Sequence, residues 1–433
     1  MRAQGLLCLV LLGLGALTTG CGHADKAPRA ITIGVLSDCT GPFAAFHDLT
    51  LAGVQLPLIQ RGGGRRGPDP ADGVDGVSVR GRPIRLVFGC NDTNMAVSTL
   101  DEARRLVERE KADVLIGPLS GNEEFVLQEY ARREPGIAFV DGSGSDQLQH
   151  PPANFFSFHT DGAQWMAGLG AYAFHTLGWR TAVTIASTSD LFSWAQVAGF
   201  TAEFCSLGGD IVKRIWIQPG TIDLSGVVAQ VPRAGVDGFF VESSDALVAM
   251  GRGYPGLRGN IARKLIPGAL AYNNQIDDLG VRRVVGLVFG SAVHLAGGGP
   301  ELARYSGALL RAFPEVGSLV ATPFDIFYYD AMSATLKALG AVDGDLSAGE
   351  RRFMAALARV RFDAPNGPVR LNGLHQAIAS NYLVRVASAS GSVPLKTVPN
   401  VEPTFGGYFS RNDPPPSKTT PACKHGHPPP WTR

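Results

Sequence analysis

The chain has 433 residues, of which 45% are hydrophobic and 18% are charged, and its formal net charge is +1. It is longer than one usual domain, so its length favours two domains. A nearly neutral chain without a basic stripe argues against nucleic acid as a partner.

The first 21 residues have the pattern of an export leader. Arg2 precedes an apolar run from Leu6 to Leu17, and small residues then lead to Cys21. This run is shorter than the roughly 20 residues of a transmembrane helix. Cys21 resembles the lipidated cysteine of a bacterial lipoprotein, although the third residue before it is Thr18 rather than the usual Leu. We expect an exported protein held at the outer face of the cell membrane by a lipid anchor; an ordinary secretory peptide cut nearby is the alternative.

Short apolar runs alternate with amphipathic stretches through most of the remaining chain. They predict strands at 31–36, 84–88, 114–116, 137–140, 182–187, 238–241, 265–267 and 286–289, with helices such as 97–111 and 194–207 between them. This alternation is typical of βαβ units and parallel sheets, and so many strands require two sheets. The first strand runs through Gly41-Pro42 directly into a helix amino terminus, a junction that suits a small polar or anionic ligand.

Two segments depart from this alternation. Residues 62–79 are rich in Gly, Arg, Pro and Asp, and we expect an exposed loop. Residues 399–433 are rich in proline and poor in apolar residues, which predicts an extended or disordered tail. The tail contains Cys423, His425 and His427, but three potential ligands in a flexible tail are usually incidental, and we predict no metal site.

Four cysteines lie beyond the leader, an even number that suits disulfides in an oxidising compartment. Cys39 and Cys90 both end predicted strands, so a disulfide joins them if those strands are neighbours. Cys205 with Cys423 follows only by elimination, because four cysteines allow three pairings.

Six segments in collinear order resemble the type I periplasmic binding proteins, in particular the branched-chain amino acid/amide-binding group that serves ABC importers. They are IGVLSDCTGPFAAF, GRPIRLVFGCNDTN, ADVLIGPLSG, IAFVDGSGSD, FDIFYYDAM and FDAPNGPVRLNGLHQAIASNYLVRV. The resemblance implies an α/β fold of two doubly wound parallel-sheet lobes joined by a three-segment hinge, with ligand bound between the lobes. It implies no cofactor. We expect a leader at 1–21, a linker at 22–29, lobe 1 at 30–158 plus 285–345, lobe 2 at 159–284 plus 346–398, and a tail at 399–433.

The resemblance also implies ligand-binding positions in the first lobe. Ser120, in GPLSG, matches a serine that holds a ligand carboxylate or amide oxygen; a plain helix cap is the alternative. Ser143 and Ser145, in DGSGS, match a turn that offers hydroxyls, and a simple Gly/Ser turn is the alternative. Phe46 matches an apolar wall that faces the ligand, or else it is a buried helix-face residue.

In the second lobe the match is weaker. Phe192 stands where amino-acid binders commonly place a tyrosine, and Ser243 replaces a frequent aromatic residue. Ala269 stands where those binders carry an acid that pairs with the ligand ammonium, and a buried ammonium without a countercharge is costly. Glu242 or Asp190 could substitute. An amide, a urea-like compound or a carboxylate therefore competes with a free branched-chain amino acid as the ligand.

Three functions fit these observations to different degrees. The favoured one is a tethered receptor that captures a small molecule and delivers it to an ABC permease and ATPase complex. A sensor that signals by lobe closure is the second, and sequence does not separate the two. An exported enzyme is the least favoured, because the chain has no Gly-x-Ser-x-Gly, His-Glu-x-x-His or Walker-type motif. His47, His159 and His294 have no ligand spacing, so surface or supporting roles are expected for them.

Overall fold

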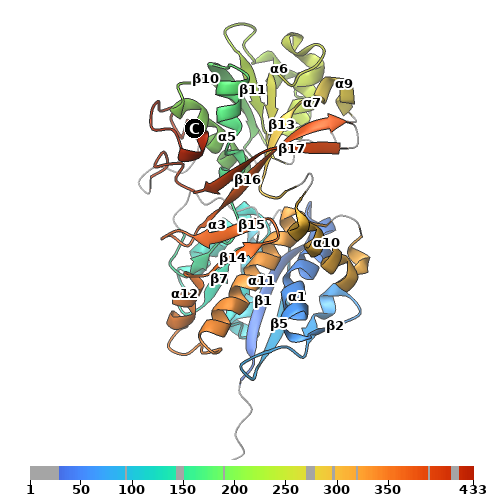
Figure 1. The fold of residues 1–433 in the computed structure, drawn as a ribbon, viewed down its shortest axis with the longest axis vertical. Helices are drawn as coiled ribbons and strands as arrows, with labels where there is room; N and C mark the ends of the chain where they lie inside the picture. Colours follow the sequence, from blue (N-terminus) through green and yellow to red (C-terminus); the bar gives the residue numbers. More distant parts are fainter. Residues whose placement is uncertain are drawn as a thin grey trace, which may run out of the picture.

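The computed structural model describes residues 29–92, 95–142, 151–188, 191–269, 278–294, 298–317, 320–388, 391–410 and 419–433. Two α/β lobes lie one above the other along the long axis of the molecule (Figure 1). The predicted two-lobed α/β fold is confirmed.

The first lobe is built on a six-stranded sheet with the strand order β4-β5-β1-β6-β7-β8. All neighbours are parallel except β4 and β5. Its strands are β1 (Ile31–Thr40), β4 (Ser78–Val79), β5 (Arg82–Asp92), β6 (Val114–Ile116), β7 (Ala138–Val140) and β8 (Phe155–Phe156). Its helices are α1 (His47–Gly62), α2 (Ala96–Arg104), α3 (Gly121–Ala131), α10 (Pro300–Ala312), α11 (Pro323–Ala341) and α12 (Arg351–Leu357). The 3-10 turns η1 (Ala44–Phe46) and η7 (Pro314–Val316) and the π-helical turn η3 (Arg105–Arg109) adjoin these helices.

Strand β1 lies at the centre of this sheet because its side chains are apolar on both faces. Ile33 and Val35 pack into the core shared with α1 and α11, whereas Leu36 packs into the core shared with α2 and α3. A strand that is covered on both faces has a nearly continuous apolar sequence, as the parallel-sheet prediction requires.

The second lobe has a four-stranded parallel sheet with the order β10-β9-β11-β12. Its strands are β9 (Thr181–Ser187), β10 (Asp210–Ile217), β11 (Gly238–Val241) and β12 (Leu265–Pro267). Its helices are α4 (Leu169–Ala171), α5 (Leu191–Ser206), α6 (Ser225–Ala229), α7 (Ser244–Gly253) and α9 (Val281–Val284), with the short turns η4 (Gln164–Met166), η5 (Tyr172–Thr176) and η6 (Pro255–Leu257).

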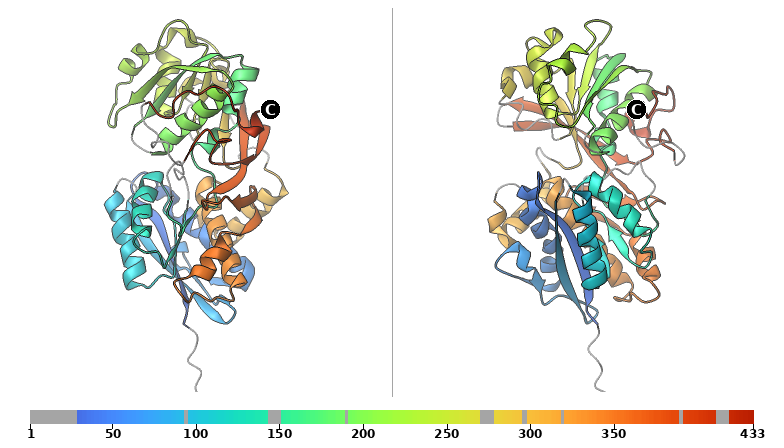
Figure 2. Two further views of the ribbon diagram at one scale, coloured as in Figure 1. Left: turned by 90° about the vertical axis from the view of Figure 1, so that its left-hand side faces the viewer. Right: turned by 180° about the vertical axis from the view of Figure 1, so that it is seen from behind.

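An antiparallel sheet joins the lobes. It contains β13 (Val288–Ser291), β14 (Arg361–Ala364), β15 (Gly367–Leu371), β16 (Ala377–Ser388) and β17 (Gly391–Val401). Strand β16 passes from one lobe to the other: Ala377 packs into the core of the first lobe, and Val384 and Val386 pack into that of the second. Figure 2 shows β16 and β17 as the ribbon that links the lobes. The chain thus crosses three times, after β8, after β13 and within β16.

Two of these crossings differ from the boundaries that the sequence suggested. The expected boundary at 285 comes too early, because β13 pairs with β16 and its Phe289 lies in the second-lobe core. The boundary at 346 also comes too early, since α12, β14 and β15 pack on the first lobe through Phe353, Ala364 and Val369. The third crossing occurs inside the continuous strand β16. An apolar strand pattern does not show where such a strand passes from the core of one lobe to the core of the other.

Among the described residues, four cysteines form two disulfides. Cys39–Cys90 joins neighbouring strands β1 and β5, as expected from the sequence, and Cys205–Cys423 fastens the tail to α5. The prediction of an unpacked tail is wrong for its described part. Phe405 and Trp431 are buried in the hydrophobic core beside α5, and η8 (Pro430–Thr432) ends the chain there. A few large aromatic side chains and one covalent bond compensate for the low apolar content.

Residues 62–79 also pack more than expected. This segment forms β2 (Arg65–Arg66), η2 (Pro70–Asp72), β3 (Val74–Asp75) and β4. Val74 and Val77 are buried in the core of the first lobe. Two isolated valines give no periodic pattern, which is why the sequence did not indicate their burial.

Cys21 and the rest of the proposed leader lie outside the described residues. Within the described ranges, the helices are all too short or too polar to cross a bilayer.

Candidate functional site between the lobes

The candidate residues of the first lobe lie where its parallel strands end. Ser37 and Asp38 lie near the end of β1, Ser120 follows β6, and Asp141 follows β7. Because the carboxyl ends of parallel strands share one edge of a sheet, these residues lie along the same edge. Ser143 and Ser145 fall outside the described residues.

Ser120 is the amino-terminal cap of α3. It is half-buried, and its backbone N–H donates to Glu123 Oε2 at 3.1 Å, which forms a capping box. The capping role that the sequence offered as the alternative is therefore present. A ligand role for the same residue stays a prediction, and the two are compatible because the cap leaves Ser120 at a helix amino terminus.

A buried acidic pair that the sequence reasoning missed lies behind Ser120. Glu123 and Asp38 are both fully buried, and Asn91 Nδ2 donates to both, at 2.8 Å to Glu123 Oε1. Burial, followed by repulsion from Asp38, raises the pKa of Glu123 to about 8. Glu123 therefore keeps its proton at neutral pH. The cysteine pair could have indicated part of this site from the sequence. If Cys39 and Cys90 lie on neighbouring strands, Asp38 and Asn91 lie opposite each other, as they do in the structure.

A second buried network lies at the first crossing. His159 Nε2 and Asp141 Oδ2 are 3.0 Å apart, and both side chains are buried. Ser157 Oγ donates to Asp141, and the His159 ring stacks on Phe327 with centroids 4.6 Å apart. A surface or supporting role was expected for His159. Its side chain is buried, which rules out the surface role. The network holds the segment after β8 against α11, beside the place where the chain leaves the lobe.

Phe46 and Phe192 supply aromatic surface from opposite lobes. Both are half-buried, and both pack against one hydrophobic core that spans the crossings. Phe46 stacks on Phe324 with centroids 4.2 Å apart, and Phe192 meets the Trp165 ring edge-on at 5.0 Å. Neither ring is fully covered by these contacts, so each has surface left for a ligand.

In the second lobe, Ser243 is the cap of α7. Its Oγ accepts the N–H of Ala246 at 3.3 Å. The preceding Glu242 is half-buried and accepts the backbone N–H of Ser187, at the end of β9, at 3.2 Å. A helix cap explains why a serine stands here, and a ligand contact remains predicted.

Ala269 is buried two residues after the end of β12. Its N–H donates to Gln196 Oε1 at 2.7 Å. Gln196 is fully buried on α5, and its Nε2 has no hydrogen-bond partner among the described residues. A Cβ on Gly268 would contact Gln196 Oε1 and the Cα and Cβ atoms of Glu242, so Glu242 lies beside the residue that precedes Ala269. Asp190, the other proposed substitute, is outside the described residues.

The two lobes touch where α3 and α5 begin. The N–H of Leu191 donates to Asn122 Oδ1 at 3.2 Å. Ser120 is two residues from one side of this bond and Phe192 is next to the other. The structure thus brings Ser120 and Phe192, 72 positions apart in sequence, to one junction between the lobes.

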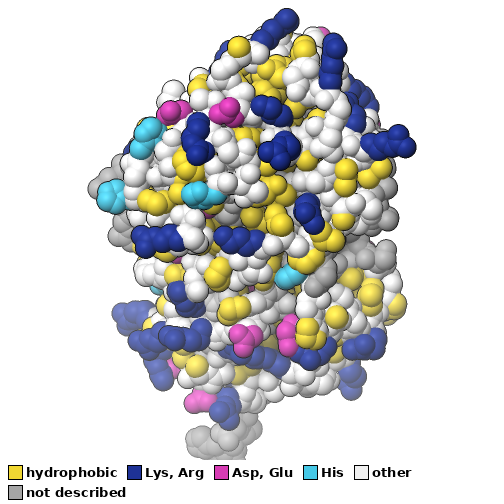
Figure 3. Space-filling model, turned by 45° about the horizontal axis from the view of Figure 1, so that its top comes forward, with side chains coloured by type: hydrophobic (Ala, Val, Ile, Leu, Met, Phe, Trp, Pro, Cys, Tyr) yellow, Lys and Arg dark blue, Asp and Glu magenta, His cyan; other side chains and the backbone are white. Residues whose placement is uncertain are grey.

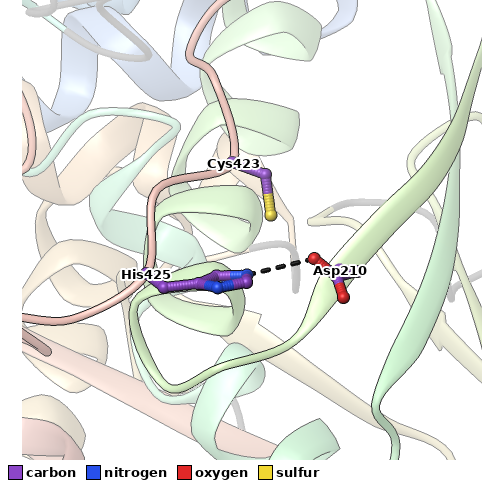
Figure 4. A group of neighbouring side chains, drawn as sticks. All are labelled: Asp210, Cys423 and His425. Carbon is purple, nitrogen blue, oxygen red and sulfur yellow. Dashed lines mark hydrogen bonds and ion pairs between the residues drawn. The ribbon is translucent and has the colours of Figure 1, made fainter.

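Asp210, Cys423 and His425 lie together at the tail and resemble a metal-ligand group (Figure 4). The sulfur of Cys423 is bonded to Cys205, so it offers no thiolate. His425 Nε2 lies 3.0 Å from Asp210 Oδ1 and both side chains are exposed, which describes a surface ion pair. These contacts support no metal site.

The fold defines a class of two-lobed α/β proteins with polar strand ends at the junction between the lobes. A family model described as periplasmic binding protein matches residues 30–391, and the chain belongs to this family. A search of curated proteins finds no significant match.

Solved structures of the same fold share little sequence with the chain. An ABC transporter substrate-binding protein from Sphaerobacter thermophilus is 21% identical with a TM-score of 0.71, covering 86% of this chain and 99% of its own. A solute-binding protein from R. palustris in complex with benzoate is 20% identical with a TM-score of 0.67, and the match covers 86% of this chain and 97% of that protein. A branched-chain amino acid transporter protein from Streptococcus pneumoniae in complex with isoleucine is 15% identical (TM-score 0.66; 85% and 100%).

Proposed function

We propose that the protein is the extracytoplasmic ligand-binding component of an ABC importer, tethered to the membrane through Cys21, and that it delivers a small molecule to a permease and ATPase complex without altering it. Family membership supports the general role. The main observation behind the site assignment is the junction of α3 and α5, where the Leu191–Asn122 hydrogen bond joins the two lobes. A ligand bound there would contact both lobes and favour closure.

We propose a ligand without a free ammonium group, such as an aromatic or aliphatic carboxylate or an amide. Ala269 offers no charge to an ammonium, and Gln196 Nε2 is a buried donor without a partner among the described residues. Phe46 and Phe192 supply apolar ring faces. The raised pKa of Glu123 keeps the acid behind Ser120 neutral, which reduces repulsion of an anion. A structurally similar protein from R. palustris was solved in complex with benzoate, which supports the proposal of a carboxylate ligand.

A thermal-shift panel of benzoates, short carboxylates, amides, urea analogues and branched-chain amino acids tests this assignment. Ligand in large excess over its Kd raises the melting temperature, since it binds only the folded state. We expect shifts with carboxylates or amides and none with leucine. Ser120→Ala should reduce the shift, whereas an unchanged shift would remove Ser120 from the site. Substrate turnover by the pure protein would instead favour an enzyme.

A sensor that signals by lobe closure uses the same site. Ligand-dependent uptake by cells that carry the permease, lost on deletion of this protein, distinguishes import from signalling.

A further inference from the structure

A basic hollow lies on the first lobe, away from the junction between the lobes. It has a volume of about 530 Å³ and lies between the end of α11, helix α12 and the start of β14. Its lining consists of alanines, valines and four cations, namely Lys337, Arg352, Arg359 and Arg361. The surface of the hollow is therefore a mixture of apolar and basic side chains.

The cations of the hollow are only partly neutralised. Arg352 pairs with Asp345 at 2.9 Å, and Lys337 Nζ lies 5.8 Å from the centre of the Phe362 ring. Arg359 and Arg361 are exposed and make no ion pair with any described residue. No acidic residue is among the lining residues. Excess positive charge around a concave surface favours a bound anion, and guanidinium groups match phosphate geometry.

The hollow adjoins the start of the described chain. The turn after α11 contains Gly344, whose carbonyl accepts from Arg82, and Arg82 Nε donates to the carbonyl of Arg29 at 3.0 Å. Gly344 also lies beside Ile31. The start of β1 and the end of α11 therefore occupy the same outer end of the lobe, remote from the second lobe (Figure 1).

We infer that this hollow binds the phosphate headgroup of an anionic membrane lipid and orients the tethered protein on the bilayer. The choice of a lipid as the occupant rests on the proposed tether at Cys21. Seven residues separate Cys21 from Arg29, and the eight steps between them span at most about 29 Å, so a lipid-anchored chain would keep this end of the lobe near the headgroups. An anionic membrane surface attracts each nearby Lys or Arg, and the effect falls off within a Debye length.

The test measures co-sedimentation of the unlipidated mature chain, residues 22–433, with phosphatidylglycerol/phosphatidylcholine vesicles and with pure phosphatidylcholine vesicles. One variant changes Lys337, Arg352, Arg359 and Arg361 to Gln. The matched control changes four exposed second-lobe arginines to Gln, namely Arg233, Arg258, Arg263 and Arg282. Lysine and arginine side chains are spread over the face of both lobes seen in Figure 3, so the control is needed to separate position from net charge.

We expect binding to the anionic vesicles only, a loss of tenfold or more in the hollow variant, and little change in the control. An equal loss of vesicle binding in both variants would mean that net charge alone explains the binding, which would overturn the proposal. So would the absence of wild-type binding, or binding of soluble glycerol phosphate without binding of vesicles. Melting temperatures of both variants check folding. Because no lipid anchor is present and no transported ligand is added, the result is independent of the lipidation and import assignments.

Discussion

Ala269 follows β12 with its methyl group buried and its N–H held by Gln196. The sequence drew attention to position 269 but did not indicate its partner, because Gln196 and Ala269 are 73 positions apart and meet only through the fold. At this scale, Ala269 adds no charge of its own beside Glu242, the nearby acid of the second lobe.

Ala269→Asp should introduce binding of branched-chain amino acids and weaken binding of carboxylates, because the new charge pairs with an ammonium and repels an anion. The same thermal-shift panel measures the exchange. Ala269→Asn is the matched control, since it has nearly the same shape without the charge. Equal behaviour of Asp and Asn variants would contradict the electrostatic explanation.

Glu123 gives a pH dependence of stability with a definite sign. Its pKa is raised to about 8 in the folded protein, so the folded state holds a proton that the unfolded chain has released above its ordinary value near 4.5. The stabilising contribution is complete below about pH 4.5 and is lost as the pH rises to about 8.

The free energy of unfolding should therefore fall by a few kcal/mol across this range on account of Glu123. Glu123→Gln, which cannot ionise, should flatten this part of the profile, as measured by urea unfolding at several pH values. An unaltered slope in the variant would show that other buried acids, such as Glu203 or Glu350, carry the effect.

At the scale of elements, the contact of α1 with α11 builds the first lobe around β1. Gly53 lies at this contact, and a Cβ there would collide with the backbone carbonyl of Asp325. A helix after Gly41-Pro42 was expected from the sequence, but α11 was not predicted from apolar periodicity. The close approach of the two helices was not expected either, because a glycine inside a helix gives no indication of which helix passes beside it.

Gly53→Ala should destabilise the protein by about 1–3 kcal/mol, because two helix backbones must move apart. Gly340→Ala, on the exposed side of α11 with nothing within 4 Å, should instead stabilise by roughly 0.5–1 kcal/mol. Denaturant unfolding of both variants checks the contrast. Stabilisation by Gly53→Ala would mean that the helices are not in contact there.

At the scale of the whole molecule, the tail connects distant parts of the chain. Cys423 is bonded to Cys205 on α5, and Arg214 on β10 donates to the carbonyls of Thr419 and Pro421. A proline-rich composition predicted an unpacked tail. The prediction failed because composition gives the number of apolar residues but not where they lie. In the fold, the rings of Phe405 and Trp431 meet edge-on within one hydrophobic core.

Cys423→Ser should lower the free energy of unfolding by about 2–4 kcal/mol and expose the tail to protease. Thermal unfolding and limited proteolysis under non-reducing conditions measure both effects. Cys205→Ser should have the same effects as Cys423→Ser, because it removes the same disulfide. If the tail of either variant remained as resistant as the wild type, packing alone would hold it.

The sequence by itself determined the class of fold, the positions of most of the parallel strands, the Cys39–Cys90 pair and the family, because these depend on apolar periodicity and on local motifs. Only the tertiary structure decided where the chain changes lobes, that the tail packs, and that Asp38, Asn91 and Glu123 share one buried site. Those features depend on contacts between residues far apart in the chain, and such contacts leave no periodic trace in it.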